Sequence, residues 1–162
     1  MSDLTHFDGE GRAQIVDVGE KSISRRVATA SAIMRMEAPT LARIIDREIA
    51  KGDVQAVARI AGIMGAKQTA NLIPLCHPIP IDSVTIDFLP ISPTELKISG
   101  TVVSNGRTGV EMEALAAVST TALTVYDMCK AIDRWMTIGR IQLDHKSGGK
   151  QGQLNRPSTP QS

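Results

Sequence analysis

The sequence predicts an α+β fold, a ferredoxin-like sandwich in which helices pack on one face of an antiparallel sheet. The first observation is the order of the predicted elements, which is strand, helices, hairpin, helix and strand, as in a split βαβ unit. The second is the length of 162 residues, the size of one ordinary domain. The third is composition, because 42% of the residues are hydrophobic but only 2% are aromatic. A core of small aliphatic side chains favours close packing between elements.

We expect three regions along the chain. Residues 1–26 are polar and contain glycines, so they should form an N-terminal arm in which only residues 15–18 are patterned like a short strand. Residues 27–150 should form a single ferredoxin-like domain. Residues 151–162 are polar and contain prolines, which predicts a disordered tail.

The domain should begin with a strand and a first helix. Residues 27–36 are dense in small and β-branched side chains, which indicates a strand that is buried on both faces or lies at a subunit contact. Pro39 suits the first turn of a helix that should end near Ile49. Gly52 and Asp53 then predict a helix stop and a new N-cap.

The helix that follows Asp53 should run to about Lys67. Its apolar residues recur at intervals of three and four on one face, and they are Val57, Ile60, Ala61 and Met64. Gly62 and Gly65 each weaken such a helix by about 1 kcal/mol relative to alanine. Glycines retained at these positions indicate that another element approaches the backbone closely.

A hairpin, the longest helix and a last strand complete the domain. Apolar and polar residues alternate over 84–88 and again over 96–102, with a turn at 90–94, which predicts a β-hairpin. Residues 110–132 should form the longest helix, and Thr108 and Glu111 fit a Thr-x-x-Glu capping box at its start. A strand over about 137–144 follows.

Charge and cysteine content restrict the function classes. A net charge of +1 is far from the strongly basic balance of proteins that bind nucleic acid non-specifically. No apolar run reaches the roughly 18 residues of a membrane span. Cys76 and Cys129 lack metal-type spacing, and reduced thiols in a cytoplasmic protein are their simplest explanation. We therefore expect neither a nucleic acid nor a membrane partner.

Leu75, Cys76 and His77 lie between Pro74 and Pro80, on a rigid connection from helix to hairpin. Histidine changes charge near neutral pH, so His77 could exchange protons or, when charged, bind a phosphate. A single structural hydrogen bond is the alternative. The thiol of Cys76 is more typical of a small buried side chain than of a ligand or nucleophile.

The turn over residues 105–109 is rich in glycine and opens the longest helix, where free N–H groups can bind an anion. Glu111 and Glu113 follow at once, and carboxylates in a first helical turn are stabilised by the helix dipole. The capping box already accounts for Glu111. Glu113 has no such local explanation, so it is the better candidate for a site.

Near the other end of this helix, Asp127 and Lys130 are three residues apart and share a face. An ordinary surface ion pair explains this spacing. Acid–base catalysis would use the same pair, because burial lowers the basicity of a lysine while a carboxylate holds it in place. Both explanations stay open on the local sequence.

Basic residues occur in four separate segments rather than in one run. They are solvated surface unless the fold gathers them, in which case they would form a cationic pocket for a polyphosphate; these residues are Lys21, Arg25, Arg26, Lys51, Lys67, Lys146 and Lys150. The stretch Lys146-Ser-Gly-Gly-Lys150 resembles a flexible loop that closes over such a ligand. It lacks the full pattern of a P-loop.

Several strings along residues 4–150 together resemble the cyclic pyranopterin monophosphate synthase family, molybdenum cofactor biosynthesis protein C. They occur in the family's order and are long enough to be specific; among them are Leu4-Thr-His-Phe7, Ile15-Val-Asp-Val18, Lys51-Gly-Asp-Val54, Ala58-Arg-Ile-Ala-Gly-Ile63, Leu72-Ile-Pro-Leu-Cys-His-Pro78, Thr108-Gly-Val-Glu-Met-Glu-Ala-Leu115, Tyr126-Asp-Met-Cys-Lys-Ala131 and Lys146-Ser-Gly-Gly-Lys150.

The resemblance implies a ferredoxin-like lyase that assembles as a homohexamer, a trimer of dimers with active sites where subunits meet. Its reaction converts (8S)-3',8-cyclo-7,8-dihydroguanosine 5'-triphosphate into cyclic pyranopterin monophosphate and diphosphate. The family's catalytic residues fall on Asp127 and Lys130, and its substrate-binding segments on Leu75, Cys76, His77, Met112 and Glu113. Other site positions map to Lys21, Arg26, Lys51, Lys67, Glu111 and Lys146.

In that reaction Lys130 and Asp127 would shuttle protons as the purine imidazole ring opens and the pyranopterin closes. His77 and Glu113 would orient the purine or ribose, and the basic residues would neutralise the triphosphate. No cofactor is expected, although Mg²⁺ could accompany the substrate phosphates.

Three residues depart from the family's usual pattern. Gly65 and Gln68 stand where alanine and a basic residue are more common, and Asn71 stands where aspartate is usual. Gln68 removes one potential phosphate contact, which bears on affinity more than on the type of reaction.

Two other functions fit parts of the sequence. A ferredoxin-like oligomer that binds a nucleotide as a regulator would use the basic residues but not Asp127 opposite Lys130. A metal-dependent polyphosphate hydrolase would need Mg²⁺ ligands, and only scattered carboxylates are present.

Overall fold

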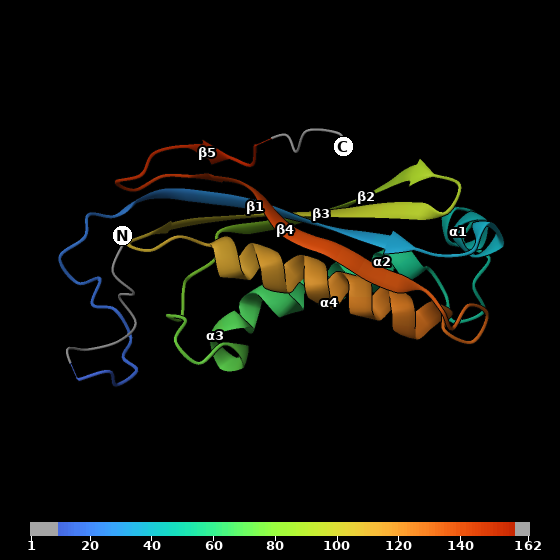
Figure 1. The fold of residues 1–162 in the computed structure, drawn as a ribbon, viewed down its shortest axis with the longest axis horizontal. Coiled ribbons are helices and arrows are strands. Elements are labelled where there is room, and N and C mark those ends of the chain that lie inside the picture. The colour runs from blue at the N-terminus through green and yellow to red at the C-terminus, as the bar shows by residue number, and fades with distance from the viewer. Residues whose placement is uncertain (1–9, 158–162) are drawn as a thin grey trace.

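The computed structural model describes residues 10–157 and contains one five-stranded antiparallel sheet with strand order β2-β3-β1-β4-β5 (Figure 1). The strands are β1 (Ser24–Arg35), β2 (Ser83–Ser92), β3 (Glu95–Gly106), β4 (Thr137–Ser147) and β5 (Leu154–Asn155). The first strand is central, between β3 and β4, so the two strands that flank it come from later in the chain. This arrangement confirms the predicted ferredoxin-like fold class.

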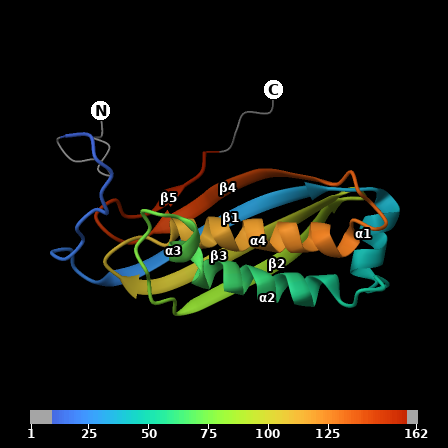
Figure 2. The ribbon, with the colours of Figure 1, turned by 90° about the horizontal axis from the view of Figure 1, so that it is seen from below.

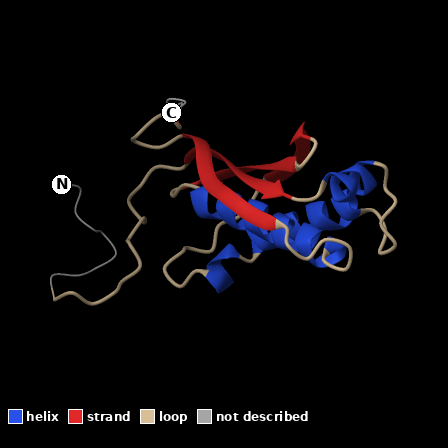
Figure 3. Cartoon of the chain, turned by 45° about the vertical axis from the view of Figure 1, so that its right-hand side comes forward, coloured by secondary structure: helices blue, strands red, loops and turns tan. Residues whose placement is uncertain are grey.

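The helices lie on one side of the sheet, as Figure 3 shows. They are α1 (Ala38–Ile45), α2 (Val54–Lys67), α3 (Thr69–Leu72) and α4 (Glu111–Cys129). The two long helices α2 and α4 run side by side against the sheet (Figure 2). None of the helices within residues 10–157 combines the length and the apolar character needed to cross a membrane.

The core lies between the sheet and α4 and is built from small side chains. Alternate residues of β1 face the helices and are fully buried, because side chains of a strand alternate between its faces; they are Ala28, Ala30, Ala32 and Met34. The matching buried face of α4 consists of Ala114, Ala117, Val118, Ala122 and Val125. As the low aromatic content predicts, aliphatic packing dominates.

Two glycines allow α2 to approach α4. A Cβ atom on Gly62 would collide with the Thr121 hydroxyl and would lie 3.1 Å from the Ala117 carbonyl oxygen. A Cβ atom on Gly65 would collide in the same way with the side chain of Thr120. The inference that another element approaches this backbone is therefore confirmed.

The buried face of α2 differs from the one that periodicity suggested. The residues that face the interior are Val54, Ala58, Gly62, Gly65 and Ala66. The apolar stripe of the sequence pattern instead faces outward, with exposed fractions of 44% for Val57, 60% for Ile60 and 58% for Met64. Close helix–helix packing selects the small residues, so the larger apolar ones are left outside.

Several predicted boundaries shift. α1 ends at Ile45 rather than near Ile49, and Arg47 adopts a left-handed φ of 59° that cannot continue a helix. Asp53 caps α2 as predicted, since its carboxylate accepts a hydrogen bond from the Ala56 N–H at 3.0 Å. α4 ends at Cys129, so the predicted extension to residue 132 is wrong.

The arm and tail also differ from expectation where the structure describes them. Residues 15–18 form no strand, since they pair with no strand of the sheet; the Val16 backbone oxygen instead faces His77 in the loop before β2. In the tail, Leu154–Asn155 form β5 against β4 rather than lacking structure. Residues 1–9 and 158–162, which belong to the expected arm and tail, lie outside the described residues.

Candidate active site

A cavity of about 310 Å³ opens beside the N-terminal end of α4. Four segments that are distant in sequence line it: the arm, the loop before β2, the turn before α4 and the first turn of α4. The residues are Val16, Val18 and Lys21; Leu75, Cys76, His77 and Ile79; Thr108 and Gly109; and Glu111, Met112 and Glu113. Its volume lies at the lower end of the range typical of small-molecule sites.

Glu113 is the most unusual group in this cavity. Its side chain is 3% exposed, and its Oε2 has no hydrogen-bond partner within the described chain. Burial raises the pKa of this carboxyl, and the nearby negative charge of Glu111 raises it further, although a backbone N–H bond opposes both effects. An unpaired buried oxygen is costly unless a ligand satisfies it.

Glu111 pairs with a residue from the far end of the chain. Lys146 near the end of β4 donates a hydrogen bond to the Glu111 carboxylate and another to the Gln151 side-chain oxygen at 3.1 Å. The predicted capping box is therefore wrong: Val110 is the N-cap of α4, and no side chain caps it. The tertiary ion pair with Lys146 takes the carboxylate that the local motif would have used.

Arg26 lies next to the glycine pair that follows Lys146. Its guanidinium donates to the carbonyl oxygens of Gly106 and Arg107, each at 3.2 Å. A Cβ atom on Gly149 would collide with this guanidinium, and Gly148 and Gly149 have φ values of 98° and 73°. The glycines thus let the turn after β4 pass close to Arg26, which places this cation near the Glu111–Lys146 pair.

His77 joins the cavity to the arm. Its Nε2 lies 2.8 Å from the backbone oxygen of Val16. The neighbouring Cys76 is partly buried, and burial raises the pKa of its thiol, with a further contribution from the negative charge of Glu113. A thiol with a raised pKa is a poor nucleophile, in agreement with the structural role expected for Cys76.

The predicted catalytic pair forms a second cluster at the other end of α4. Lys130 Nζ lies 2.6 Å from Asp127 Oδ1, while Lys51 Nζ lies 3.9 Å from Asp127 Oδ2 and donates to the Asp127 backbone oxygen at 2.9 Å. The side chains of Asp127 and Lys130 are 62% and 50% exposed.

The electrostatics of this pair differ from expectation. The hydrogen bond from Lys130, then its charge and that of Lys51, lower the pKa of Asp127. The hydrogen bond to Asp127 and its charge raise the pKa of Lys130. The prediction that burial makes the lysine less basic is therefore wrong for the single chain, because the pair is exposed to solvent.

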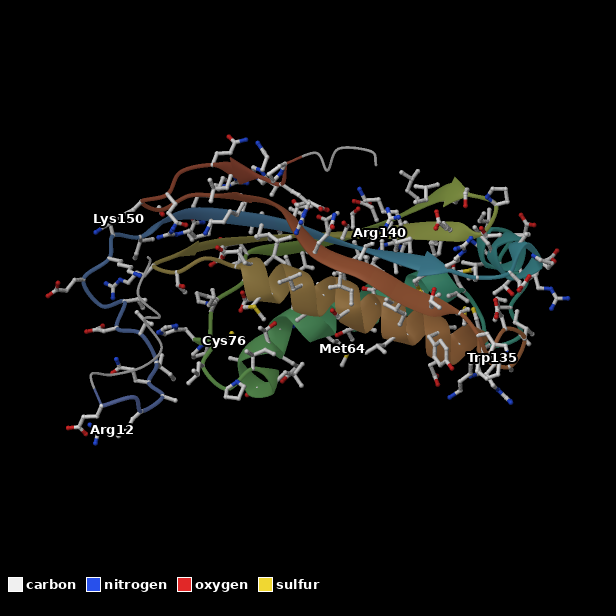
Figure 4. All side chains as sticks on the ribbon, viewed as in Figure 1. Arg12, Met64, Cys76, Trp135, Arg140 and Lys150 are labelled. Carbon is white, nitrogen blue, oxygen red and sulfur yellow. The ribbon has the colours of Figure 1, made fainter. Side chains whose placement is uncertain are left out.

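The two clusters lie apart in one chain. Glu113 and Asp127 are near opposite ends of the 19-residue α4, which puts them about 20 Å apart along the helix axis. Figure 4 shows the same separation, with Cys76 at one end of the molecule and Trp135, in the loop after α4, at the other. Lys67 lies in neither cluster and lines a separate cavity of about 330 Å³ with Ile63 and Ile81.

The fold therefore gathers some of the predicted site residues and separates others. Around the first cavity it collects Lys21, Leu75, Cys76, His77, Glu111, Met112 and Glu113, with Lys146 and Arg26 adjoining. At the distant cluster it places Lys51, Asp127 and Lys130. Within residues 10–157, His, Cys, Asp and Glu side chains nowhere come together in a group of three that could hold a metal ion.

Sequence reasoning did not assign the arm residues Val16 and Val18 or the loop residue Ile79 to the site. The only available signal was the apolar pattern at 15–18, which is also typical of a strand. That pattern carries no information about which loop the arm contacts.

Comparison with known proteins identifies the family of this chain. Residues 15–149 match the MoaC family. A cyclic pyranopterin monophosphate synthase of Desulfitobacterium hafniense is 56% identical over 95% of this chain and 94% of its own length. Proteins of that name from Brevibacillus brevis and, as synthase 1, Mycobacterium tuberculosis are each 54% identical, over 94% and 96% of this chain and 96% and 92% of their own lengths. By sequence along nearly its whole length, the chain belongs to the MoaC family.

Proposed function

We propose that this chain is a cyclic pyranopterin monophosphate synthase, a lyase of molybdenum cofactor biosynthesis. Its substrate is 3',8-cyclo-7,8-dihydroguanosine 5'-triphosphate, and its products are cyclic pyranopterin monophosphate and diphosphate. The observation that carries the proposal is one cavity, lined by four segments, that brings together a lysine, a histidine and an unpaired buried carboxyl group. Relatives that match this chain along nearly their whole length bear the name of this enzyme.

The cavity offers a distinct group to each part of such a substrate. Lys21, Arg26 and Lys146 supply positive charge for the phosphates, so that diphosphate can leave as the cyclic phosphate forms. Glu113 has a free oxygen for the N–H donors of the purine. His77 completes the set that orients the base or ribose.

Proton transfer belongs to the second cluster. The ion pair keeps Asp127 ionised and Lys130 charged, since the pKa of the first is lowered and that of the second is raised. Asp127 therefore has room for a proton and Lys130 has one to give as the imidazole ring opens and the pyranopterin closes. Because these shifts make the carboxylate a weaker base and the ammonium a weaker acid, this proton transfer requires that substrate or a second copy remove water from the pair and bring the two pKa values closer together. Lys51 adds positive charge beside them.

A complete site would need two copies of the chain. Because the two clusters lie about 20 Å apart along α4, we propose that assembly brings the Asp127–Lys130 end of one copy to the cavity of another. A hexamer built as a trimer of dimers would satisfy this requirement.

The activity test uses the purified protein with the cyclised nucleotide. We expect pyranopterin and diphosphate in equal amounts. Turnover should persist in EDTA if the basic side chains alone neutralise the phosphates, and it should stop in EDTA and return with added Mg²⁺ if that ion accompanies the phosphates. Binding without turnover would favour a nucleotide-binding regulator. Phosphate release without pyranopterin, dependent on Mg²⁺, would favour a polyphosphate hydrolase.

The shared site has its own test, in which two inactive variants are mixed. After dissociation and reassembly of Glu113→Gln with Lys130→Ala, about one quarter of the sites would receive both native halves and regain activity. Native mass spectrometry confirms that mixed oligomers form and counts their subunits. Mixed oligomers without activity would contradict a site shared between copies.

We expect this enzyme to act in the cytoplasm. Both described cysteines are free, and the cytoplasm keeps thiols reduced. Fractionation of cells that express the full chain tests this directly.

A further inference from the structure

The contact between His77 and the arm determines which nitrogen of the imidazole ring carries a hydrogen. His77 Nε2 lies 2.8 Å from the Val16 backbone oxygen, across a separation of 61 residues in sequence. A carbonyl oxygen can only accept a hydrogen bond, so the ring nitrogen that faces it must carry the hydrogen. In a neutral imidazole, the other nitrogen then has a free lone pair.

That other nitrogen, Nδ1, has no hydrogen-bond partner among the described residues, although His77 lines the cavity. The ionisable groups around the cavity are of two kinds. Lys21 is cationic, and Lys146 stands behind Glu111, whereas Glu111, Glu113 and the thiol of Cys76 are acidic. A neutral Nδ1 would add an acceptor that carries no charge.

We infer that the Val16 carbonyl positions His77: it holds the imidazole as the Nε2–H tautomer, so that Nδ1 is the atom that accepts a hydrogen bond from the substrate. In metal sites and catalytic triads, a hydrogen-bond partner on one ring nitrogen fixes both the orientation and the tautomer of the histidine. The Val16 carbonyl would act on His77 in the same way. The nature of the donor, an N–H or O–H of the cyclised nucleotide, rests on the proposed function. The assignment of the tautomer does not depend on the proposed function.

The first experiment measures the tautomer in the free, full-length protein. Nitrogen-15 spectra of histidine-labelled protein, assigned with His77→Gln, distinguish a protonated from an unprotonated ring nitrogen at each position. We expect Nε2 protonated and Nδ1 unprotonated at mildly alkaline pH. The opposite tautomer, or an even mixture, would overturn the inference even if the enzyme were fully active.

The second experiment asks which nitrogen meets the substrate. The amide of His77→Asn lies near the position of Nδ1, whereas that of His77→Gln lies near Nε2. We expect His77→Asn to keep kcat/KM within about tenfold of wild type and His77→Gln to lose at least about 100-fold. The reverse order would assign the substrate contact to Nε2. Absence of turnover in wild type would instead count against the proposed function.

The third experiment weakens the carbonyl itself. Replacing Asp17 with its α-hydroxy acid by nonsense suppression turns the Val16 carbonyl into an ester carbonyl, which is a weaker acceptor, and leaves every side chain in place. We expect a mixed tautomer population and a lower kcat. The same replacement at Ile15 weakens the Gln14 carbonyl, which bonds no described residue, and should change neither. Equal effects at both positions would refute a positioning role for Val16.

Discussion

At the scale of single residues, surroundings give similar carboxyl groups opposite properties. Glu113 and Asp127 occupy the same helix, yet burial raises the pKa of the first and a hydrogen-bonded lysine lowers that of the second. The first environment opposes ionisation of the carboxyl group, and the second favours it. This contrast supports the different roles proposed for them, binding for Glu113 and proton transfer for Asp127.

The first prediction concerns Glu113→Gln and stability. The folded state binds a proton at this site more tightly than the unfolded state, so ionisation of Glu113 lowers the free energy of unfolding as pH rises from its usual pKa of 4.5 through the raised one. Glutamine cannot ionise. Above this range we expect the variant to be more stable than wild type by about 1 kcal/mol, as measured by urea unfolding.

The pH dependence distinguishes this mechanism from a general packing effect. The difference between the two proteins should shrink as pH falls through the raised pKa and vanish below 4.5, where Glu113 becomes protonated in both states. Glu111→Gln is the matched control, and it should lose stability because it leaves Lys146 without its partner. A Glu113→Gln protein less stable than wild type at neutral pH would show that the buried oxygen is satisfied.

The second prediction concerns Lys130→Ala and catalysis. Without the ammonium group, we expect kcat to fall about 10³-fold, the scale of a lost general acid. The free energy of unfolding should barely change, because the Asp127–Lys130 pair is exposed in the single chain. We also expect the oligomer to stay intact, since an exposed ion pair contributes little to association compared with an apolar interface. Steady-state kinetics, thermal unfolding and sedimentation velocity measure the three quantities. Lys130→Arg, which keeps the charge but does not release a proton, should also be slow, and a wild-type rate in either variant would remove Lys130 from the mechanism.

Residue-level reasoning succeeded where the signal was local. The three-residue spacing identified the Asp127–Lys130 pair, and the absence of a local partner marked Glu113. It failed for Glu111, because the partner that displaces the capping box, Lys146, is 35 residues away. The local sequence also could not show whether the Lys130 side chain is buried, and in the single chain it is exposed.

At the scale of elements, the close contact between α2 and α4 supports the sheet that carries the site. Gly62 fits against Thr121 and Ala117, so the two helix backbones approach without a side chain between them. The neighbouring strand also contacts this point, because a Cβ on Gly62 would lie 3.2 Å from Ile86 Cδ1. An added Cβ atom must therefore displace the Thr121 hydroxyl and would crowd the Ala117 carbonyl oxygen and the Ile86 side chain.

The third prediction is that Gly62→Ala destabilises the protein. Alanine normally stabilises a helix by about 1 kcal/mol relative to glycine. Here overpacking should reverse the sign, with a net loss of about 2 kcal/mol in the free energy of unfolding, as measured by chemical denaturation. Adding Thr121→Ala removes the hydroxyl in the way and should restore part of this loss. A stabilised single variant would mean that the helices separate at little cost.

Sequence patterns predicted the positions of the helices and strands more reliably than which face of each element is buried. The hairpin, the Asp53 cap and both long helices were predicted within a few residues. The face of α2 was not, since hydrophobic periodicity marks large apolar residues while close packing selects small ones. The glycines were the better guide, and their meaning depends on a partner helix that periodicity cannot identify.

At the scale of the whole molecule, the single chain has two features that the proposed assembly would explain. The candidate site is divided between the two ends of α4. The outward face of α2 carries an exposed apolar stripe, formed by Val57, Ile60 and Met64, and Figure 4 shows Met64 on the side of the helices away from the sheet. Contiguous exposed apolar residues are typical of interaction surfaces. Periodicity in the sequence identified the apolar stripe, but neither its outward orientation nor the distance between the two ends of the site could be predicted without the three-dimensional arrangement.

The last prediction is that Ile60→Asp weakens the assembly while the fold stays intact. A carboxylate at the centre of the stripe would have to be desolvated in an interface but stays hydrated in a monomer, since Ile60 is 60% exposed in the single chain. We expect the dissociation constant of the oligomer to rise at least about tenfold, with an unchanged far-UV circular dichroism spectrum. Specific activity should fall with dilution in parallel with dissociation, because separated copies lack half of each site.

Ile45→Asp on α1 is the matched control for this prediction. It makes the same chemical change at a residue that is 46% exposed but lies outside the α2 stripe, so it should leave both oligomer and activity unchanged. Sedimentation velocity across a dilution series, with activity assayed on the same samples, compares the two variants. If Ile60→Asp kept a tight oligomer, the stripe would not be an interface; if it dissociated into fully active monomers, the two ends of α4 would not need to meet across copies.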